Sequence, residues 1–230
     1  MPLIRIDIIS AVPEIMESAI NASIIKIARE KQIAEINLHN LHDYATDKYR
    51  HIDDYPFGGG AGMVIQCEPV FSCIDKLKSE RDYDEIIYMA ADGVRLTQSH
   101  CNELSLKGNI IILAGHYKGV DQRVRDALIT REYSIGDFVL SGGELPAIVL
   151  ADSIVRLLPG VIGDCESALH DSFQSGLLEA PIYTRPADFR GMRVPEVLLG
   201  GHPLHIEEWR QEQSLKKTAE RRPDLLQDNI

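Results

Sequence analysis

The segment Ile110-Ile111-Ile112-Leu113-Ala114-Gly115 decides the fold class of this chain. Five apolar residues in succession that end in glycine are typical of a strand buried on both faces of a parallel sheet. Similar short strands are expected at residues 4–9, 34–38 and 86–90, and another at Tyr133-Ser134. Helical patterns lie between and after these strands, at residues 13–31, 68–78, 97–106, 120–129 and 142–158. This alternation predicts an α/β domain with a mainly parallel sheet flanked by helices.

The alternation of strands and helices ends at Pro159-Gly160. The residues that follow are mixed in composition and rich in glycine and serine, which predicts a linker. A long amphipathic helix is expected from Leu204 to Arg222, where Pro223 ends it. We therefore predict a larger domain, a linker and a small, mainly helical domain, at residues 1–160, 161–175 and 176–230.

The composition is that of an ordinary globular protein, with 44% hydrophobic and 26% charged residues among 230. No apolar run approaches the roughly 20 residues that a membrane span needs. The first residues carry Arg5 and Asp7 inside their apolar stretch, which is not the pattern of a signal peptide. The four cysteines are widely spaced and contain no CxxC pair, so we expect reduced thiols in a cytoplasmic protein.

The charge distribution limits how the chain can bind nucleic acid. The net charge of −11 argues against a broad basic face. Residues 1–175 carry 16 Lys and Arg against 26 Asp and Glu, whereas residues 181–222 carry 8 against 6. An RNA site, if present, is therefore expected to be local and determined by shape.

Three glycine-bearing loops are candidates for ligand binding. Residues 57–63 are rich in glycine but lack the Lys-Ser/Thr of a P-loop. Residues 115–119 follow a buried strand, at the edge of a parallel sheet where ligands bind. Residues 135–143 form an apolar loop whose backbone could recognise an adenine edge while side chains pack on its faces. Each loop taken alone is equally typical of a turn.

Taken together, the motifs are specific. Residues 115–123, Gly-His-Tyr-Lys-Gly-Val-Asp-Gln-Arg, and residues 134–146, Ser-Ile-Gly-Asp-Phe-Val-Leu-Ser-Gly-Gly-Glu-Leu-Pro, resemble the cofactor site of the tRNA (guanine-N1)-methyltransferases, a family of the SPOUT class. The resemblance extends over nearly the whole chain in order, through residues 55–63, 159–161, 171–173, 183–186 and 208–210.

The resemblance implies a fold and an activity that composition and periodicity do not give. It implies that the second and third loops form a trefoil knot at the end of the larger domain and hold a bent S-adenosylmethionine. It also implies a homodimer with shared active sites, and methylation of guanine N1 at tRNA position 37. Residues 176–230 would then bind tRNA, although their charged helix is equally typical of an ordinary solvated helix.

The resemblance also assigns residues to roles. The cofactor would be held by Tyr88, Met89, Ala90, Ala91, Gly115, Tyr117, Lys118, Gly119, Ile135, Gly136, Asp137, Phe138, Val139, Leu140, Gly142 and Gly143. Asp171 would remove the N1 proton and Arg156 would meet guanine O6. From the residues alone, an N-cap for Asp171 and a solvated helix residue for Arg156 are favoured, because these are the common roles. His170 is an alternative base, because histidine titrates near neutral pH.

Several positions depart from the family pattern. His116 stands where arginine is usual, Lys118 where glutamate is usual, and Ala90-Ala91 where Ser-Pro is usual. Backbone contacts should survive these changes, and we expect Lys118 not to abolish catalysis. No set of side chains has the spacing of a metal site, and the sequence leaves open whether Mg²⁺ is needed.

Three other functions are compatible with part of the pattern. The first is another SPOUT methyltransferase that acts on a ribose or a ribosomal base, against which Asp171 and the match at residues 183–186 count. The second is a nucleotide- or RNA-binding module without catalysis, which the charge reversal at Lys118 keeps open. The third is a dehydrogenase-like Rossmann protein, which the missing GxGxxG disfavours.

Overall fold

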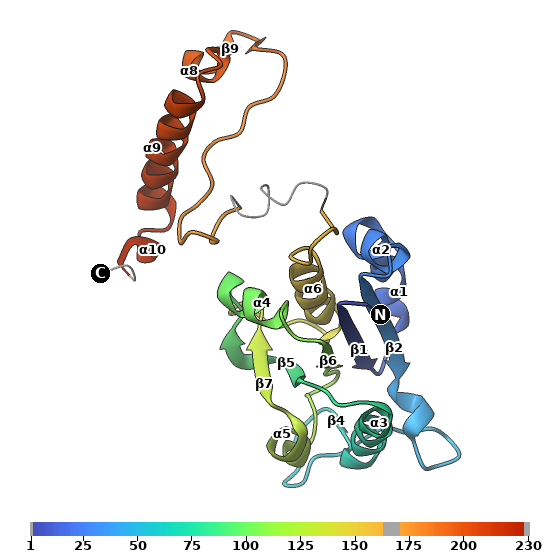
Figure 1. Cartoon of the computed structure of the whole chain (residues 1–230). Helices are drawn as coiled ribbons and strands as arrows, with labels where there is room; N and C mark the ends of the chain where they lie inside the picture. Colours follow the sequence, from blue (N-terminus) through green and yellow to red (C-terminus); the bar gives the residue numbers. More distant parts are fainter. Residues whose placement is uncertain (1, 163–170, 228–230) are drawn as a thin grey trace. The chain divides into compact units, whose positions relative to one another are not determined.

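The computed structural model describes residues 2–162 and 171–227 (Figure 1). Contacts within the chain divide it into two compact units, Met1–Gly163 and Asp164–Ile230. This division falls inside the interval 161–175 that the sequence assigns to a linker.

The first unit is built on a sheet of five parallel strands in the order β2-β1-β6-β5-β7. The strands are β1 (Ile4–Ser10), β2 (Ala34–Asn40), β5 (Glu85–Arg95), β6 (Asn109–Ala114) and β7 (Arg131–Ser134). The central strand β6 is the apolar run that the sequence singles out, and its residues from Ile110 to Ala114 are fully buried. The prediction of an α/β domain with a parallel sheet is confirmed.

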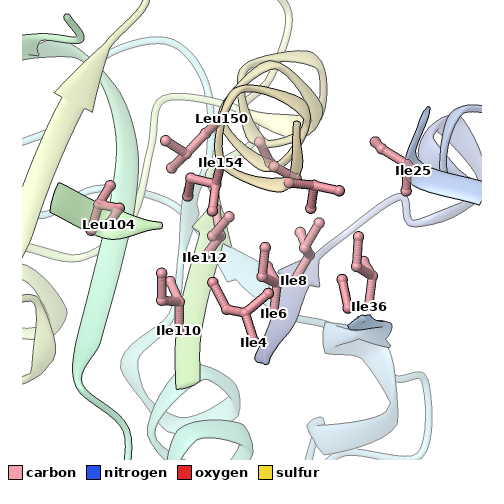
Figure 2. Packing of buried hydrophobic residues seen from close by; sticks show 14 of the residues in the cluster. Ile4, Ile6, Ile8, Ile25, Ile36, Leu104, Ile110, Ile112, Leu150 and Ile154 are labelled. Carbon is pink, nitrogen blue, oxygen red and sulfur yellow. The ribbon is translucent and has the colours of Figure 1, made fainter. Parts of the chain in front are cut away.

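Helices cover both faces of this sheet (Figure 1). One face carries α1 (Glu14–Ile20), α2 (Ser23–Glu30), α4 (Gln98–Leu104) and α6 (Glu144–Val155). The other carries α3 (Cys67–Glu80), α5 (Gln122–Leu128) and the 3₁₀ turn η1 (Leu41–Tyr44). Alternate residues of a strand point to opposite faces. Ile6 and Ile112 accordingly pack beneath Leu150 and Ile154 of α6 (Figure 2), whereas Leu113 joins the core under α3.

Two sequence-based predictions of elements need correction. The single helix predicted at residues 13–31 is two helices, because Asn21 caps α1 and Ala22 is extended. Strand β5 is longer than the predicted 86–90, because it continues past an irregularity after Met89 and pairs with β7 as far as Arg95. Between β2 and Gly62 the chain forms η1 and the short strand β3 (Asp53–Asp54), which pairs with β4 (Val64–Ile65).

The second unit is organised around one long helix. Its elements are the hairpin β8 (Asp188–Phe189) and β9 (Met192–Arg193) and the helices α8 (Glu196–Leu199), α9 (Pro203–Arg221) and α10 (Asp224–Gln227). The extended chain at Leu178 is tied to α9, because its N–H donates to Thr218 Oγ1 at 2.9 Å and its carbonyl accepts from Ser214 Oγ at 2.5 Å. Thr218 is the one buried side chain within residues 171–226.

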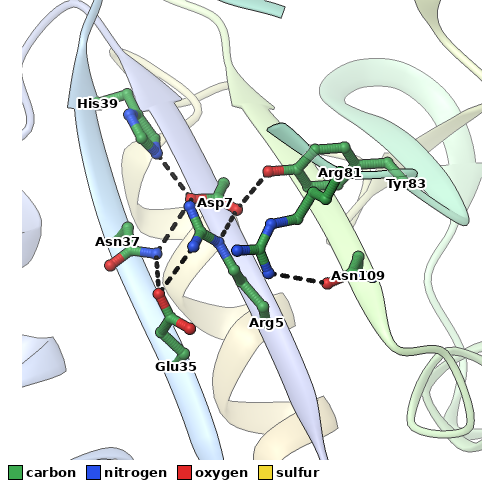
Figure 3. Close-up of polar contacts among 8 residues, drawn as sticks. All are labelled: Arg5, Asp7, Glu35, Asn37, His39, Arg81, Tyr83 and Asn109. Atoms are coloured by element: carbon green, nitrogen blue, oxygen red, sulfur yellow. Dashed lines mark hydrogen bonds and ion pairs between the residues drawn. The ribbon is translucent and has the colours of Figure 1, made fainter. Parts of the chain in front are cut away.

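A buried carboxylate crosslinks the strands on the α3 side of the sheet (Figure 3). Asp7 is fully buried and accepts hydrogen bonds from Arg5 Nε at 2.6 Å, Tyr83 Oη at 2.7 Å, His39 Nε2 at 2.8 Å and Asn37 Nδ2 at 3.1 Å. Burial alone would raise the pKa of this carboxyl group. The hydrogen bonds outweigh burial and hold the pKa of Asp7 well below its ordinary value.

We expect Asp7→Asn to lower the free energy of unfolding by about 3 kcal/mol at pH 7, because it leaves Arg5 without its buried counter-charge. Since folding lowers the pKa of Asp7, its contribution is complete above the unfolded value of about 3.9. The contribution is lost as the pH falls below that value through the folded pKa. Urea unfolding at a series of pH values measures both effects.

The exposed Asp82→Asn serves as the control and should change stability by less than about 0.5 kcal/mol. Equal stability of Asp7→Asn and the wild type at pH 7 would contradict this account of the network.

Candidate active site

Three segments meet at the carboxyl edge of the parallel sheet. They are residues 88–92 of β5, residues 115–120 after β6 and residues 133–143 of β7 and the loop that follows it. Together they line a cavity of about 500 Å³. This volume lies within the range of roughly 300–1,000 Å³ that is common for small-molecule sites. The location is also where parallel sheets bind their ligands.

All but two of the residues predicted to hold a cofactor line this cavity. Those that do are Tyr88, Met89, Ala90, Ala91, Gly115, Tyr117, Lys118, Gly119, Ile135, Phe138, Val139, Leu140, Gly142 and Gly143. Gly136 and Asp137 are not among the lining residues. The exposed Asp137 pairs with Arg95 at 2.6 Å, and a Cβ atom added to Gly136 would lie 2.5 Å from the ring of Phe138. Ligand contact by any of these residues stays a prediction.

The second and third segments approach each other so closely that glycine is required. The N–H of Gly143 donates to the carbonyl of Gly115 at 2.5 Å. A Cβ atom on Gly143 would lie 2.7 Å from the Gly115 nitrogen, and one on Gly115 would lie 2.8 Å from the ring of Tyr88. These distances are shorter than any side chain tolerates, so the two glycines fix the shape of the cavity wall.

Some lining residues were missed from the sequence, notably Arg125 of α5. Its guanidinium donates to Glu132 Oε1 at 2.8 Å and to Asp92 Oδ2 at 2.9 Å. Its central carbon lies 5.4 Å from the centroid of the Tyr88 ring, a cation–π geometry. Burial raises the pKa of Tyr88. The other unpredicted lining residues are Asp92, His116, Val120, Tyr133, Ser134, Ser141 and Pro146.

The glycine-rich loop is joined to the second segment of the site. The backbone N–H of Lys118 donates to the Met63 carbonyl at 3.0 Å, and that of Ile65 donates to the Gly119 carbonyl at 3.0 Å. The aliphatic stem of Lys118 packs on Gly62, where a Cβ atom would lie 2.9 Å from Lys118 Cγ. Lys118, the charge reversal noted in the sequence, is therefore held at the cavity by its stem and its backbone.

The two predicted catalytic residues lie in different units. Arg156 follows the last turn of α6 in the first unit, and its N–H donates to the Asp152 carbonyl at 3.0 Å. Asp171 is half-buried in the second unit and begins a turn, in which its carbonyl accepts from Gln174 N–H at 3.2 Å. Residues 172–180 contain no helix, so the alternative interpretation of Asp171 as an N-cap is wrong. His170 lies outside the described residues.

The described part of the chain offers neither a metal site nor a membrane-spanning helix. Residues 2–162 and 171–227 contain no group of three His, Cys, Asp or Glu side chains placed to hold a metal ion. No helix in these two ranges combines the length and the apolar character that crossing a membrane would need.

The chain matches the model of one protein family over residues 4–228, described as tRNA (guanine-1)-methyltransferase TrmD. The chain belongs to this family. Its relatives include proteins named tRNA (guanine-N(1)-)-methyltransferase. That of Bacteroides fragilis is 59% identical over 97% of this chain and all of the relative. Those of Christiangramia forsetii and Chlorobaculum tepidum are 60% and 58% identical, over 97% and 96% of this chain and 99% and 96% of the relatives.

In a member of this methyltransferase family, the close packing at Gly115 predicts how a substitution there changes the affinity for the methyl donor. Gly115→Ala places a methyl group against the buried ring of Tyr88, so the ring must move and the cavity wall with it. We expect affinity for S-adenosylmethionine to fall at least about tenfold, since a distorted pocket wall typically costs a ligand about 1–3 kcal/mol of binding free energy. Isothermal calorimetry on the folded variant measures this change.

Gly108→Ala is the matched control, because its Cβ atom would lie 3.6 Å from the nearest neighbour, Asp84 Oδ2. If Gly115→Ala folds and binds S-adenosylmethionine as tightly as Gly108→Ala, the cavity is not the donor site.

Proposed function

We propose that this enzyme transfers the methyl group of S-adenosylmethionine to N1 of guanine at position 37 of tRNA, next to the anticodon. The observation that carries the proposal is the cavity at the carboxyl edge of the sheet, lined by all three predicted segments. Membership of the tRNA (guanine-1)-methyltransferase family over nearly the whole chain supplies the substrate class.

The residues of the cavity suit S-adenosylmethionine. Phe138, Val139 and Leu140 provide apolar contacts for a purine ring. Backbone groups of the segments that contain Gly115 and Gly143 line the same cavity and can form hydrogen bonds with the edge of the purine. A Cβ atom on Gly115 would collide with the Tyr88 ring, and one on Gly143 would collide with the Gly115 nitrogen. The shape of this wall of the cavity therefore depends on both glycines. When bound, the cofactor supplies a methyl group on a sulfonium, which is already electrophilic.

The residues of the protein must make guanine N1 nucleophilic. Guanine N1 carries a proton and is a poor nucleophile until that proton leaves. Asp171 takes the N1 proton as a general base, and Arg156 donates to O6, where negative charge develops. Holding the acceptor nitrogen in line with the methyl group is the third requirement, and it falls to the residues that bind the RNA.

We infer that the enzyme is a homodimer in which Asp171 serves the cofactor of the other subunit. Support comes from exposed apolar side chains of α6, after the third segment, which a single subunit leaves in water: Leu145 and Val149. Residues 171–226 bury only Thr218 and so have little apolar core of their own. A small unit of this kind gains stability by packing on another surface.

We further infer that the first unit contains a trefoil knot. Helix α6 follows β7 at one edge of the sheet, yet it packs against β1 and β6 at the centre. The segment between them therefore crosses the ends of β5 and β6, and it bonds to the loop after β6 through Gly143 and Gly115. A crossing of this kind is what a knotted chain needs, although knots are rare among folds.

The second unit is assigned to tRNA binding, and the enzyme to the cytoplasm where tRNA acts. This unit has a cavity of about 850 Å³ between residues 175–183 and α9. In it the rings of Tyr183 and Trp209 lie 6.3 Å apart, beside Arg210. Aromatic rings and arginine are the groups that stack on unpaired bases.

The activity is tested with labelled S-adenosylmethionine and unmodified tRNA transcripts, followed by mapping of the methylated atom. We expect label on N1 of guanine 37 and none in a transcript with adenine at that position. Label on a ribose hydroxyl would assign the chain to another kind of methyltransferase. If the protein binds S-adenosylmethionine but transfers no methyl group to the transcripts, the chain is a binding module without catalysis. Repeating the assay with and without Mg²⁺ decides whether an ion is needed.

We expect Asp171→Ala and Asp171→Asn to lower turnover about 10²–10⁴-fold, because each removes the general base. The affinity for S-adenosylmethionine should stay close to that of the wild type, since Asp171 acts on guanine. Single-turnover kinetics with calorimetry separates the two quantities. The exposed Glu212→Gln, in the same unit, is the control. Full activity of the Asp171→Ala variant would show that Asp171 is not the general base.

Mixing subunits tests the shared site. An Asp171→Ala subunit combined with an Arg156→Ala subunit forms one site with neither lesion if the two residues come from different subunits. Activity should then return in the heterodimer, to about half that of the wild type per dimer. Verified heterodimers that stay as inactive as their parents would show that each subunit supplies both residues.

A further inference from the structure

A buried carboxylate lies directly behind the cavity wall, outside the set of lining residues. Glu144, the first residue of α6, is 2% exposed. Its Oε1 accepts a hydrogen bond from Ser10 Oγ, at the end of β1, at 2.8 Å. Its Oε2 lies 3.4 Å from Nδ1 of His116, which does line the cavity. One carboxylate therefore joins the end of β1, the loop after β6 and the start of α6.

Buried and helical neighbours fix the position of the Glu144 carboxylate. Ser10 is itself fully buried, and its Oγ accepts the N–H of Val12 at 2.9 Å, which orients its proton toward Glu144. The carboxylate stands in the first turn of α6, where the helix dipole favours negative charge. The contact at 3.4 Å is a hydrogen bond in the His116 tautomer that carries its proton on Nδ1, because a carboxylate oxygen only accepts.

The same pair explains a glycine in the third segment. A Cβ atom on Gly142 would overlap Glu144 Oε2 and would lie 2.6 Å from His116 Nδ1. His116 and Gly142 also form an isolated antiparallel bridge, next to the hydrogen bond from Gly143 to Gly115. The carboxylate and the imidazole thus occupy the space between the second and third segments of the site, and no side chain fits beside them.

We propose that Glu144 is a positioning residue for the methyl donor, which acts through His116. By holding the imidazole, Glu144 sets the spacing between residues 115–119 and residues 134–143, and so the width of the cavity. Ser10 fixes the carboxylate to the central part of the sheet. This inference rests on the proposed function of the cavity as the site of S-adenosylmethionine.

The expected consequence is a change in cofactor binding with little change in the chemical step. Glu144→Gln keeps the shape but removes the charge, and His116→Phe keeps a ring but removes the donor. Each should raise the Kd and KM for S-adenosylmethionine about tenfold, the difference between a charged and a neutral hydrogen bond. The kcat at saturating cofactor should stay within about twofold, because neither residue meets guanine.

A comparison of the single and double variants at Glu144 and His116 distinguishes a positioning role from a general loss of structure. The double variant should bind about as weakly as either single variant, because the second change removes nothing that remains. His116→Arg should bring the Kd back to within about threefold of the wild type, because a guanidinium still donates to Glu144. Glu17→Gln, an exposed glutamate on α1, is the matched control.

Calorimetry on the full-length protein gives these constants, with circular dichroism to confirm folding. An unchanged Kd in Glu144→Gln, effects that multiply to about a hundredfold in the double variant, or no rescue by His116→Arg would each overturn the inference. If Glu144→Gln does not fold, the comparison of His116→Phe with His116→Arg still decides. A wild type that does not bind S-adenosylmethionine overturns the function of the cavity, and this inference with it. Normal binding in every variant overturns this inference alone.

Discussion

The hydrogen bond between the Gly143 N–H and the Gly115 carbonyl is the contact on which the site depends. It brings the end of the central strand β6 against the start of α6, and a side chain on Gly143 would prevent it. Helix α6 then covers β1 and β6, where its apolar residues complete the core. The same helix therefore closes the cavity at its first turn and stabilises the sheet along its length, so loss of the close approach would weaken both.

The sequence predicted the sheet because its strands are continuous apolar runs, which parallel strands buried on both faces require. It missed features that depend on distant partners. The extension of β5 from Ala91 to Arg95 contains no apolar run, and β7 pairs with it at Val94 and Arg95. The break at Asn21 lies inside a helical pattern, and the apolar spacing continues through it. Local patterns carry no information about either.

The sequence likewise predicted the segments of the candidate site, but not the side chains that depend on distant partners. Glycine-bearing segments at strand ends are visible in a sequence, and most of the predicted residues do line one cavity. Glu144 and Arg125 were not found, because Ser10 is 134 positions from Glu144 and Asp92 is 33 positions from Arg125. The roles of Asp171 and Arg156 come from family resemblance, since a single carboxylate and a single arginine have no distinguishing local pattern. The cofactor residues that the resemblance predicts and the position of the strand ends indicate the same edge of the sheet.

The central claim is that the cavity at this edge holds the methyl donor, and a crystal structure of the protein with S-adenosylmethionine tests it most directly. The account predicts adenosine density among residues 88–91, 115–119 and 135–140, with the purine against the loop at Phe138 and backbone groups of the glycines at hydrogen-bond distance. Density for the cofactor at another place, with this cavity empty at a saturating concentration, would contradict the account.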